Sequence, residues 1–216
     1  MKKQFQVSTV GALLLIGFAI AVLIYNEQQA TDLNDVAAQN ASVLVRDYSP
    51  TIGNKNAKVT IVEFFDPACE TCKAFHPFVK QLMQRNPGRI KLVMRYLPLH
   101  QGSDYVVKLL EAAKLQRKFW QTLDATYESQ PVWASHSNPQ PEKLWPLLSG
   151  VGLNVKKAEA DMQSQTVAKH IQQDIVDAQQ LQVTKTPGFF VNGKPLVRFG
   201  YEQLQQLVEQ EIRNSY

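Results

Sequence analysis

Apolar and polar positions divide the first half of the chain into clear segments. Residues 58–65 are β-branched, aromatic and almost continuously apolar, which is typical of a central strand buried on both faces. Residues 72–84 repeat apolar side chains at helical spacing around Pro77, and an Asn-Pro-Gly tripeptide ends the run. Residues 90–97 form a second apolar run. Strand, helix and strand at this spacing predict a βαβ unit with a parallel strand pair.

A long helical pattern, a hairpin and a final helix follow. Residues 104–182 repeat apolar side chains at helical spacing, with one proline-rich interruption. Residues 189–191 and 196–198 flank an Asn-Gly turn, which is a strong hairpin pattern. Residues 201–213 are amphipathic. The order predicts an α/β sandwich, in which helices flank a mixed sheet and a helical block is inserted.

The N-terminus has the pattern of a membrane segment. Lys2 and Lys3 precede an uncharged apolar run over residues 7–25. This run is longer than the ~7–15 residues of a signal peptide and close to the ~20 of a spanning helix. The charge order places the N-terminus in the cytoplasm. We interpret residues 1–25 as an uncleaved single-pass anchor in the cytoplasmic (inner) membrane, with cleavage after Ala30 as the alternative. Both place the remainder on the periplasmic or extracytoplasmic side.

Residues 26–54 are polar and rich in Ala, Asn and Gln, so we interpret them as a stalk or linker. Residues 43–45 form one apolar patch, which suits a short edge strand, and residues 49–57 are turn-forming. A long dimerisation domain does not fit in this space.

Composition supports a globular domain and gives no sign of nucleic-acid binding. Apolar residues make up 44% of the 216 residues. The net charge of +4 is spread along the chain, with basic pairs only at positions such as Lys156-Lys157. A solvated basic surface therefore explains the charge.

Cys69 and Cys72 are the only cysteines, and they lie as C-x-x-C at the predicted junction of strand and helix. The start of a helix stabilises a thiolate through its unpaired N–H groups and its dipole. We expect Cys69 to be the nucleophile and Cys72, one turn later, the resolving thiol. A zinc site needs about four ligands, and the four histidines are scattered, so we predict no metal. Those histidines are His76, His100, His136 and His170.

These motifs together resemble the DsbA-like thiol–disulfide oxidoreductases, over roughly residues 55–215. The motifs are Val-Glu-Phe-Phe running into Cys-Glu-Thr-Cys with Pro77 beyond it, Lys118-Phe119-Trp120 followed by Asp124, Thr-Pro-Gly-Phe-Phe-Val-Asn-Gly at residues 186–193, and the closing helix. One departure is the Glu-Thr dipeptide between the cysteines, where the best-known oxidase of the family has Pro-His.

The resemblance implies a thioredoxin-like fold with an inserted helical domain, here preceded by an N-terminal transmembrane helix. Its two thioredoxin-like parts would be residues 55–102 and 183–216, with the helical insertion at 103–182. The resemblance implies no cofactor beyond a redox-active Cys69–Cys72 disulfide. It also implies exported cysteine-containing proteins as substrates and, by analogy, a quinone-linked DsbB-like membrane partner.

Glu63 lies in the predicted central strand among apolar neighbours and matches the family's acidic residue. A buried carboxyl has a raised pKa and can carry a proton to or from Cys72. The alternative is a solvated position at the edge of the strand.

Glu70 and Thr71, between the cysteines, are expected to tune the pKa of Cys69. The charge of Glu70 should keep that pKa in the upper half of the ~3.5–7.5 range of such thiols. Alternatively, Glu70 only complements the helix dipole.

Thr186 and Pro187 resemble the family's cis-proline loop, which lies against the cysteines and binds the substrate backbone. An ordinary trans proline that opens a strand is the alternative.

We therefore predict an extracytoplasmic thiol–disulfide oxidoreductase that acts as an oxidase. An isomerase or reductase of the same fold is one alternative. A Cu(I)-binding or chaperone module is another, because thiolates suit this soft ion, although Met83, Met94 and Met162 are distant from Cys69 in sequence.

Overall fold

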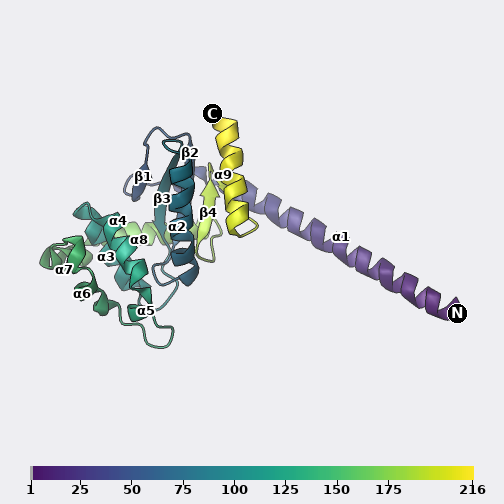
Figure 1. Ribbon diagram of the computed structural model, residues 1–216, viewed down its shortest axis with the longest axis horizontal. Coiled ribbons are helices and arrows are strands. Elements are labelled where there is room, and N and C mark those ends of the chain that lie inside the picture. The colour runs from purple at the N-terminus through teal and green to yellow at the C-terminus, as the bar shows by residue number, and fades with distance from the viewer. Residues whose placement is uncertain (1) are drawn as a thin grey trace.

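The computed structural model describes the backbone of residues 2–216 and the side chains of residues 15–25 and 27–216. A five-stranded sheet lies at the centre, helices cover both of its faces, and a block of helices extends to one side (Figure 1). The α/β sandwich with an inserted helical block, predicted from the sequence, is confirmed.

Helix α1 (Lys2–Gln39) is a single 38-residue helix that projects from the domain (Figure 1). It continues through the predicted anchor and half of the predicted stalk. The anchor's first fourteen side chains lie outside the described residues. Among the side chains that are described, no helix is long and apolar enough to cross a membrane. A 3₁₀ turn at Ala41–Val43 follows, so the short strand expected at residues 43–45 is wrong.

The sheet has the strand order β1-β3-β2-β4-β5. Strands β2 and β3 are parallel, with Glu63 opposite Met94, and the other neighbours are antiparallel. The predicted βαβ unit is therefore confirmed, with helix α2 (Glu70–Arg85) as the crossover. The strands are β1 (Thr51–Gly53), β2 (Val59–Phe65), β3 (Ile90–Tyr96), β4 (Gly188–Val191) and β5 (Lys194–Pro195).

Two strand boundaries differ from the sequence prediction. The turn-forming stretch after residue 49 contains β1, whose Thr51 pairs with Val93. The hairpin's second strand comprises Lys194 and Pro195, not residues 196–198. Asn192 and Gly193 both have positive φ, as a two-residue turn requires, so pairing resumes directly after the glycine.

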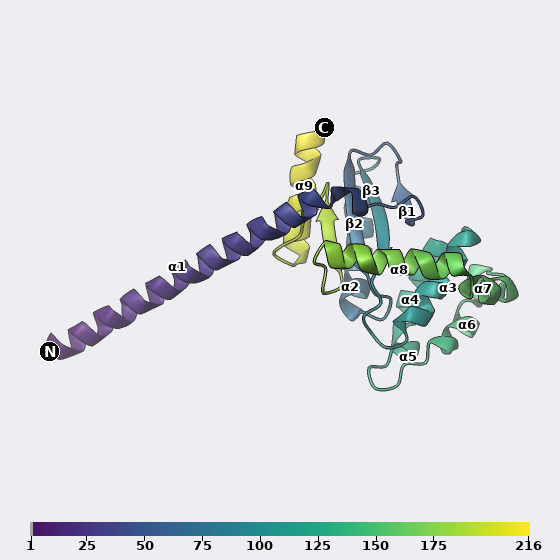
Figure 2. The same ribbon diagram turned by 180° about the vertical axis from the view of Figure 1, so that it is seen from behind.

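Alternation along β2 builds two cores. Val59, Ile61 and Phe65 face α2 and α9 (Tyr201–Ser215) in the larger core. Val62 and Phe64 face the opposite side, where the end of α1 and the end of α8 (Gln165–Gln180) cover the sheet (Figure 2). Glu63 belongs to the first set by this alternation, so its carboxyl points toward α2.

The inserted block begins after β3 and returns to the sheet through α8 (Figure 2). Trp133 is fully buried there and donates from Nε1 to the carbonyl oxygen of Thr126 at 3.0 Å. The predicted proline-rich loop thus contains a short helix. The helices before α8 are α3 (Ser103–Leu115), α4 (Phe119–Glu128), α5 (Gln130–Trp133), α6 (Leu144–Leu147) and α7 (Val155–Met162).

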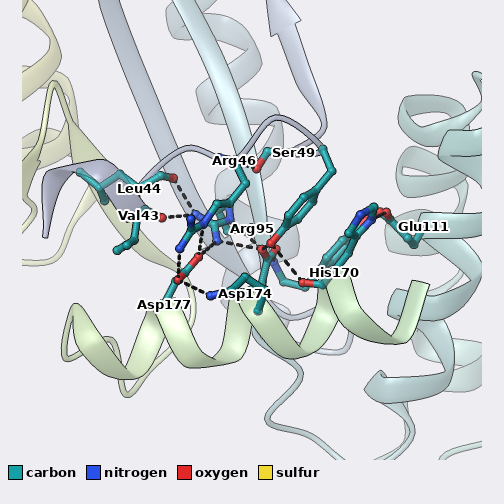
Figure 3. Close-up of polar contacts among 12 residues, drawn as sticks. Val43, Leu44, Arg46, Ser49, Arg95, Glu111, His170, Asp174 and Asp177 are labelled. Atoms are coloured by element: carbon teal, nitrogen blue, oxygen red, sulfur yellow. Dashed lines mark hydrogen bonds and ion pairs between the residues drawn. The ribbon is translucent and has the colours of Figure 1, made fainter. Parts of the chain in front are cut away.

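A buried ionic network joins the linker, the sheet and the insertion (Figure 3). Arg95 of β3 is fully buried and pairs with Asp174 and Asp177 of α8. Its Nη1 also donates to the carbonyl oxygens of Val43 and Leu44. This guanidinium therefore holds three segments together that are far apart in sequence.

The linker adds a second cation and a hydroxyl to the network. Arg46 donates to both carboxylate oxygens of Asp177, from Nε at 2.8 Å and from Nη2 at 2.6 Å. Tyr48 donates its hydroxyl to Asp174 at 2.7 Å. Residues 43–48 are thus part of the folded domain.

We predict that Arg95→Leu lowers the free energy of unfolding by about 3–5 kcal/mol, because it leaves Asp174 and Asp177 without the partner that compensates their burial. Urea unfolding followed by circular dichroism measures this change. Lys157→Ala is the control, since it removes an exposed i,i+4 pair with Asp161 and should change stability by less than about 1 kcal/mol. Equal effects of the two substitutions would contradict the prediction.

Candidate functional site

The site forms where β2 ends and α2 begins. Cys69 has extended backbone angles and is the N-cap of α2, and its Sγ accepts a hydrogen bond from the backbone N–H of Cys72 at 3.4 Å. A sulfur thus takes the capping role that an oxygen usually has. Both cysteines are free thiols.

The surroundings of Cys69 favour its thiolate. A hydrogen bond from the Cys72 thiol lowers the pKa of Cys69 to about 6; burial opposes this effect, and the Cys72 N–H and the Thr186 side chain add to it. Cys69 is only 6% exposed. The pKa of Cys69 is thus in the range expected from the sequence, and hydrogen bonds are the main cause of its shift.

Cys72 has the opposite character. It is completely buried. Burial raises its pKa well above the ordinary value, and the hydrogen bond that it donates to Cys69 and the charge of Glu63 act in the same direction. Two thiols three residues apart therefore differ strongly in acidity.

Glu70 is exposed at the first turn of α2. Its carboxylate is 79% exposed and lies 3.5 Å from Nε2 of His136. Water screens such a charge strongly, and the largest effects on the pKa of Cys69 come from other groups. Thr71, the other residue of the dipeptide, lines a groove beside the site.

The loop before β4 faces the cysteines. The Thr186–Pro187 peptide bond is cis, which confirms that prediction. The carbonyl oxygen of Thr186 lies 3.3 Å from Cys69 Sγ, where the thiol donates to it. An adjacent groove of about 540 Å³ is lined by residues that include Leu33, Thr71, Val183, Thr186, Pro187 and Phe199.

Glu63 is buried beneath the thiols. It is 1% exposed, and neither carboxyl oxygen has a hydrogen-bond partner among the described residues. Burial raises its pKa to about 8, and the charge of Cys69 adds to the effect. A solvated position at a strand edge is excluded, since β2 lies between β3 and β4.

Sequence reasoning missed Asp66, which fixes the loop ahead of Cys69. This fully buried carboxylate accepts hydrogen bonds from the backbone N–H of Ala68 at 2.8 Å and of Leu99 at 2.6 Å. His100 donates to it from its backbone N–H, its Nδ1 lies 2.8 Å away, and the Ser103 hydroxyl adds a further bond. An acid directly after a buried strand was the available signal.

We predict that Thr186→Val raises the pKa of Cys69, because the hydroxyl that it removes favours the thiolate. Ultraviolet absorbance of the thiolate against pH measures it. Thr186→Ser keeps a hydroxyl and should retain the native value. A Val variant that titrates like the native protein would refute this role.

Glu63→Gln should change how stability depends on pH. The pKa of Glu63 is about 8 in the folded protein and 4.5 ordinarily, so the folded state holds the extra proton between these values. Stability therefore falls as pH rises through this window. Gln cannot ionise, so across the window from about pH 4 to pH 8 the reduced variant should gain on the order of 5 kcal/mol in stability relative to the native protein.

Urea unfolding of the reduced proteins across this pH range checks that prediction. Glu142→Gln is the matched control, because Glu142 is exposed and its variant should follow the native curve. Parallel pH profiles for native protein and Glu63→Gln would show that Glu63 ionises normally.

Comparison with known proteins agrees with this geometry. A family described as Thioredoxin matches residues 46–210. The crystal structure of a thioredoxin-like oxidoreductase from Silicibacter pomeroyi DSS-3 is 30% identical, with a TM-score of 0.69 over 81% of this chain and 98% of that one.

Two curated relatives match over most of this chain. Disulfide bond formation protein D of Bacillus subtilis is 23% identical over 77% of this chain and 78% of its own length. A Na(+)/H(+) antiporter NhaA of Herminiimonas arsenicoxydans is 28% identical over 88% of this chain, which spans only 30% of that protein. The chain belongs to the thioredoxin family, among its DsbA-like thiol–disulfide oxidoreductases with an inserted helical domain.

Proposed function

We propose that this protein introduces disulfide bonds into exported proteins through a Cys69–Cys72 pair that cycles between disulfide and dithiol. The observation that carries the proposal is the asymmetry of the two thiols. Cys69 is a good leaving group and nucleophile at neutral pH, with a pKa of about 6, whereas the pKa of Cys72 is raised well above its ordinary value.

Each cycle is a pair of thiol–disulfide exchanges. A substrate thiolate attacks Cys69; the Cys69–Cys72 bond breaks, a substrate–Cys69 bond forms, and Cys72 leaves as a thiolate that takes a proton from Glu63. A second thiolate of the substrate then attacks the first substrate sulfur, which forms the substrate disulfide and releases the Cys69 thiolate. Two electrons pass from the substrate to the cysteine pair.

The groove beside Thr186 suits an extended peptide. Thr186 and Pro187 form one wall close to Cys69, and Phe199 is a half-exposed apolar side chain on another. A peptide laid against this loop in strand fashion would present its cysteine to Sγ of Cys69.

The pKa of Cys69 supports an oxidase that is milder than the strongest ones. Pairs with nucleophile pKa values near 7 and 3.5 have potentials of about −270 and −120 mV, respectively. A pKa of about 6 places this pair between them. An isomerase or reductase of the same fold would have a reduction potential nearer the lower of these two values.

The location is also part of the proposal. The apolar run over residues 7–25 would anchor the chain in the cytoplasmic membrane as a single pass, with the catalytic domain on the periplasmic or extracytoplasmic side. Large apolar side chains of α1, such as Leu15, Phe18 and Leu23, are mostly exposed, which suits contact with lipid. A quinone-linked DsbB-like membrane protein would reoxidise the pair.

Trapping tests the function. Cys72→Ser in the full-length protein should accumulate mixed disulfides with exported proteins, because the resolving thiol is absent. Cys69→Ser is the matched control and should trap none, since it lacks the nucleophile. Reversal by dithiothreitol identifies the adducts, and mass spectrometry identifies the partners.

Equilibration with glutathione measures the reduction potential of the cysteine pair, which determines the direction of electron transfer. An oxidase should have a potential above that of thioredoxin, about −270 mV. A value at or below this figure would favour a reductase. Tight Cu(I) binding by both thiols, with no trapped protein, would favour the copper-handling alternative.

A further inference from the structure

Buried polar atoms gather behind Cys72. Four side chains carry them: Glu63, His76, Thr126 and Tyr127. Both carboxyl oxygens, Nδ1 of the imidazole and the two hydroxyls have no hydrogen-bond partner among the described residues. All four residues are at most 6% exposed. Since buried polar groups are nearly always paired, a cluster of exceptions is typical of functional sites.

These side chains come from three elements that meet under the thiols. Glu63 is on β2, His76 is on α2 one turn after Cys72, and Thr126 and Tyr127 are on α4. The rings of His76 and Tyr127 lie 5.1 Å apart. Burial raises the pKa of Tyr127, and the charges of Cys72 and Glu63 raise it further, so both act electrostatically on this hydroxyl.

The far side of His76 faces solvent through a carboxylate. Its Nε2 lies 2.6 Å from Oδ1 of Asp124 on α4, and Asp124 is 46% exposed. Lys80 lies 3.0 Å from both carboxylate oxygens, which supports their negative charge. An anionic partner fixes the proton on Nε2, so Nδ1 offers a lone pair to the interior.

The chemistry requires a proton to cross this region in every cycle. Once Glu63 has protonated the leaving Cys72 thiolate, its raised pKa of about 8 favours its protonated form again at neutral pH, so a proton enters from solvent in the reduced protein. Reoxidation sends that proton back out. Glu63 and Cys72 are 1% and 0% exposed, so neither exchanges protons with water directly.

We propose that His76, held by Asp124 and facing Tyr127, is the relay residue that carries protons between solvent and the buried Glu63–Cys72 pair. This inference rests on the proposed function. An imidazole that accepts a proton at one ring nitrogen releases one from the other, so a fixed ring moves charge between its two sides. The hydroxyl of Tyr127 is on the inner side, where it can pass the proton toward Glu63.

The groups around His76 define its pH behaviour. Lys80 acts on it from α2 and Asp124 from α4, and the ring of Tyr127, also on α4, lies 5.1 Å from its own ring. Burial lowers the pKa of His76 and outweighs the opposing effect of Asp124. The ring is therefore neutral at physiological pH, with one nitrogen free to accept a proton.

His76→Gln tests the relay in the full-length protein. Gln keeps a hydrogen-bond donor for Asp124 but cannot transfer a proton. The measurement is the stopped-flow rate at which oxidised glutathione reoxidises the reduced Cys69–Cys72 pair, the step in which the Cys72 proton has to leave, followed against pH in H₂O and D₂O. We expect the rate to fall about a hundredfold or more, the lower end of general acid–base effects, with a larger solvent isotope effect than in the native protein.

His170→Gln is the matched control, because His170 also pairs with a carboxylate, Glu111 at 2.6 Å, but does so away from the thiols. It should keep the native rate and isotope effect. Tyr127→Phe should slow the reaction in the same way as His76→Gln.

The Cys69 titration separates a relay from a structural role. In His76→Gln the pKa of Cys69 should stay at its native value while the rate falls. A native rate in this variant, or a rate that falls together with a shifted Cys69 pKa, would overturn the proposal. A native protein that exchanges no disulfide with glutathione would instead overturn the proposed function itself.

Discussion

The chemistry of this protein depends on the unequal supply of hydrogen bonds to two neighbouring sulfurs. Burial disfavours both thiolates. Cys69, as the cap of α2, accepts hydrogen bonds from the Cys72 thiol and N–H that outweigh the effect of burial on its pKa. Cys72 donates its hydrogen bond instead and is more deeply buried. The strand β2 sets this arrangement, because it delivers the chain to the helix start and places Glu63 underneath.

The inserted helices complete the site. Tyr127 and Asp124 come from α4, and Gln130 of α5 donates to the carbonyl oxygen of Pro67 at 3.0 Å, which fixes the turn ahead of Cys69. The insertion therefore shields one side of the site from water, and the loop at Thr186 lies on the opposite side. A thioredoxin fold without it would leave Cys72 closer to water and Glu63 less strongly perturbed.

Local sequence patterns predicted most of the helices and strands. They did not predict which residues far apart in the sequence pair with one another in the fold. Periodicity identified β2, α2 and β3, and the C-x-x-C and Thr-Pro motifs identified the residues that meet at the site. Strand β1 was missed because three exposed residues carry no pattern of their own. Arg95 and Asp174 lie 79 positions apart, and the histidines gave no sign of which one is buried. Contacts of this kind become visible only in the three-dimensional structure, where the helices pack against the sheet.

The anchoring of residues 43–48 has a consequence for defining an autonomous folding unit. Arg95 needs the carbonyl oxygens of Val43 and Leu44, and Asp177 needs Arg46. Ala37, at the end of α1, is also 1% exposed in the second core. A recombinant fragment trimmed to the first strand would therefore lack part of its own interior. The shortest self-sufficient version should start upstream of Ala37, within the long helix.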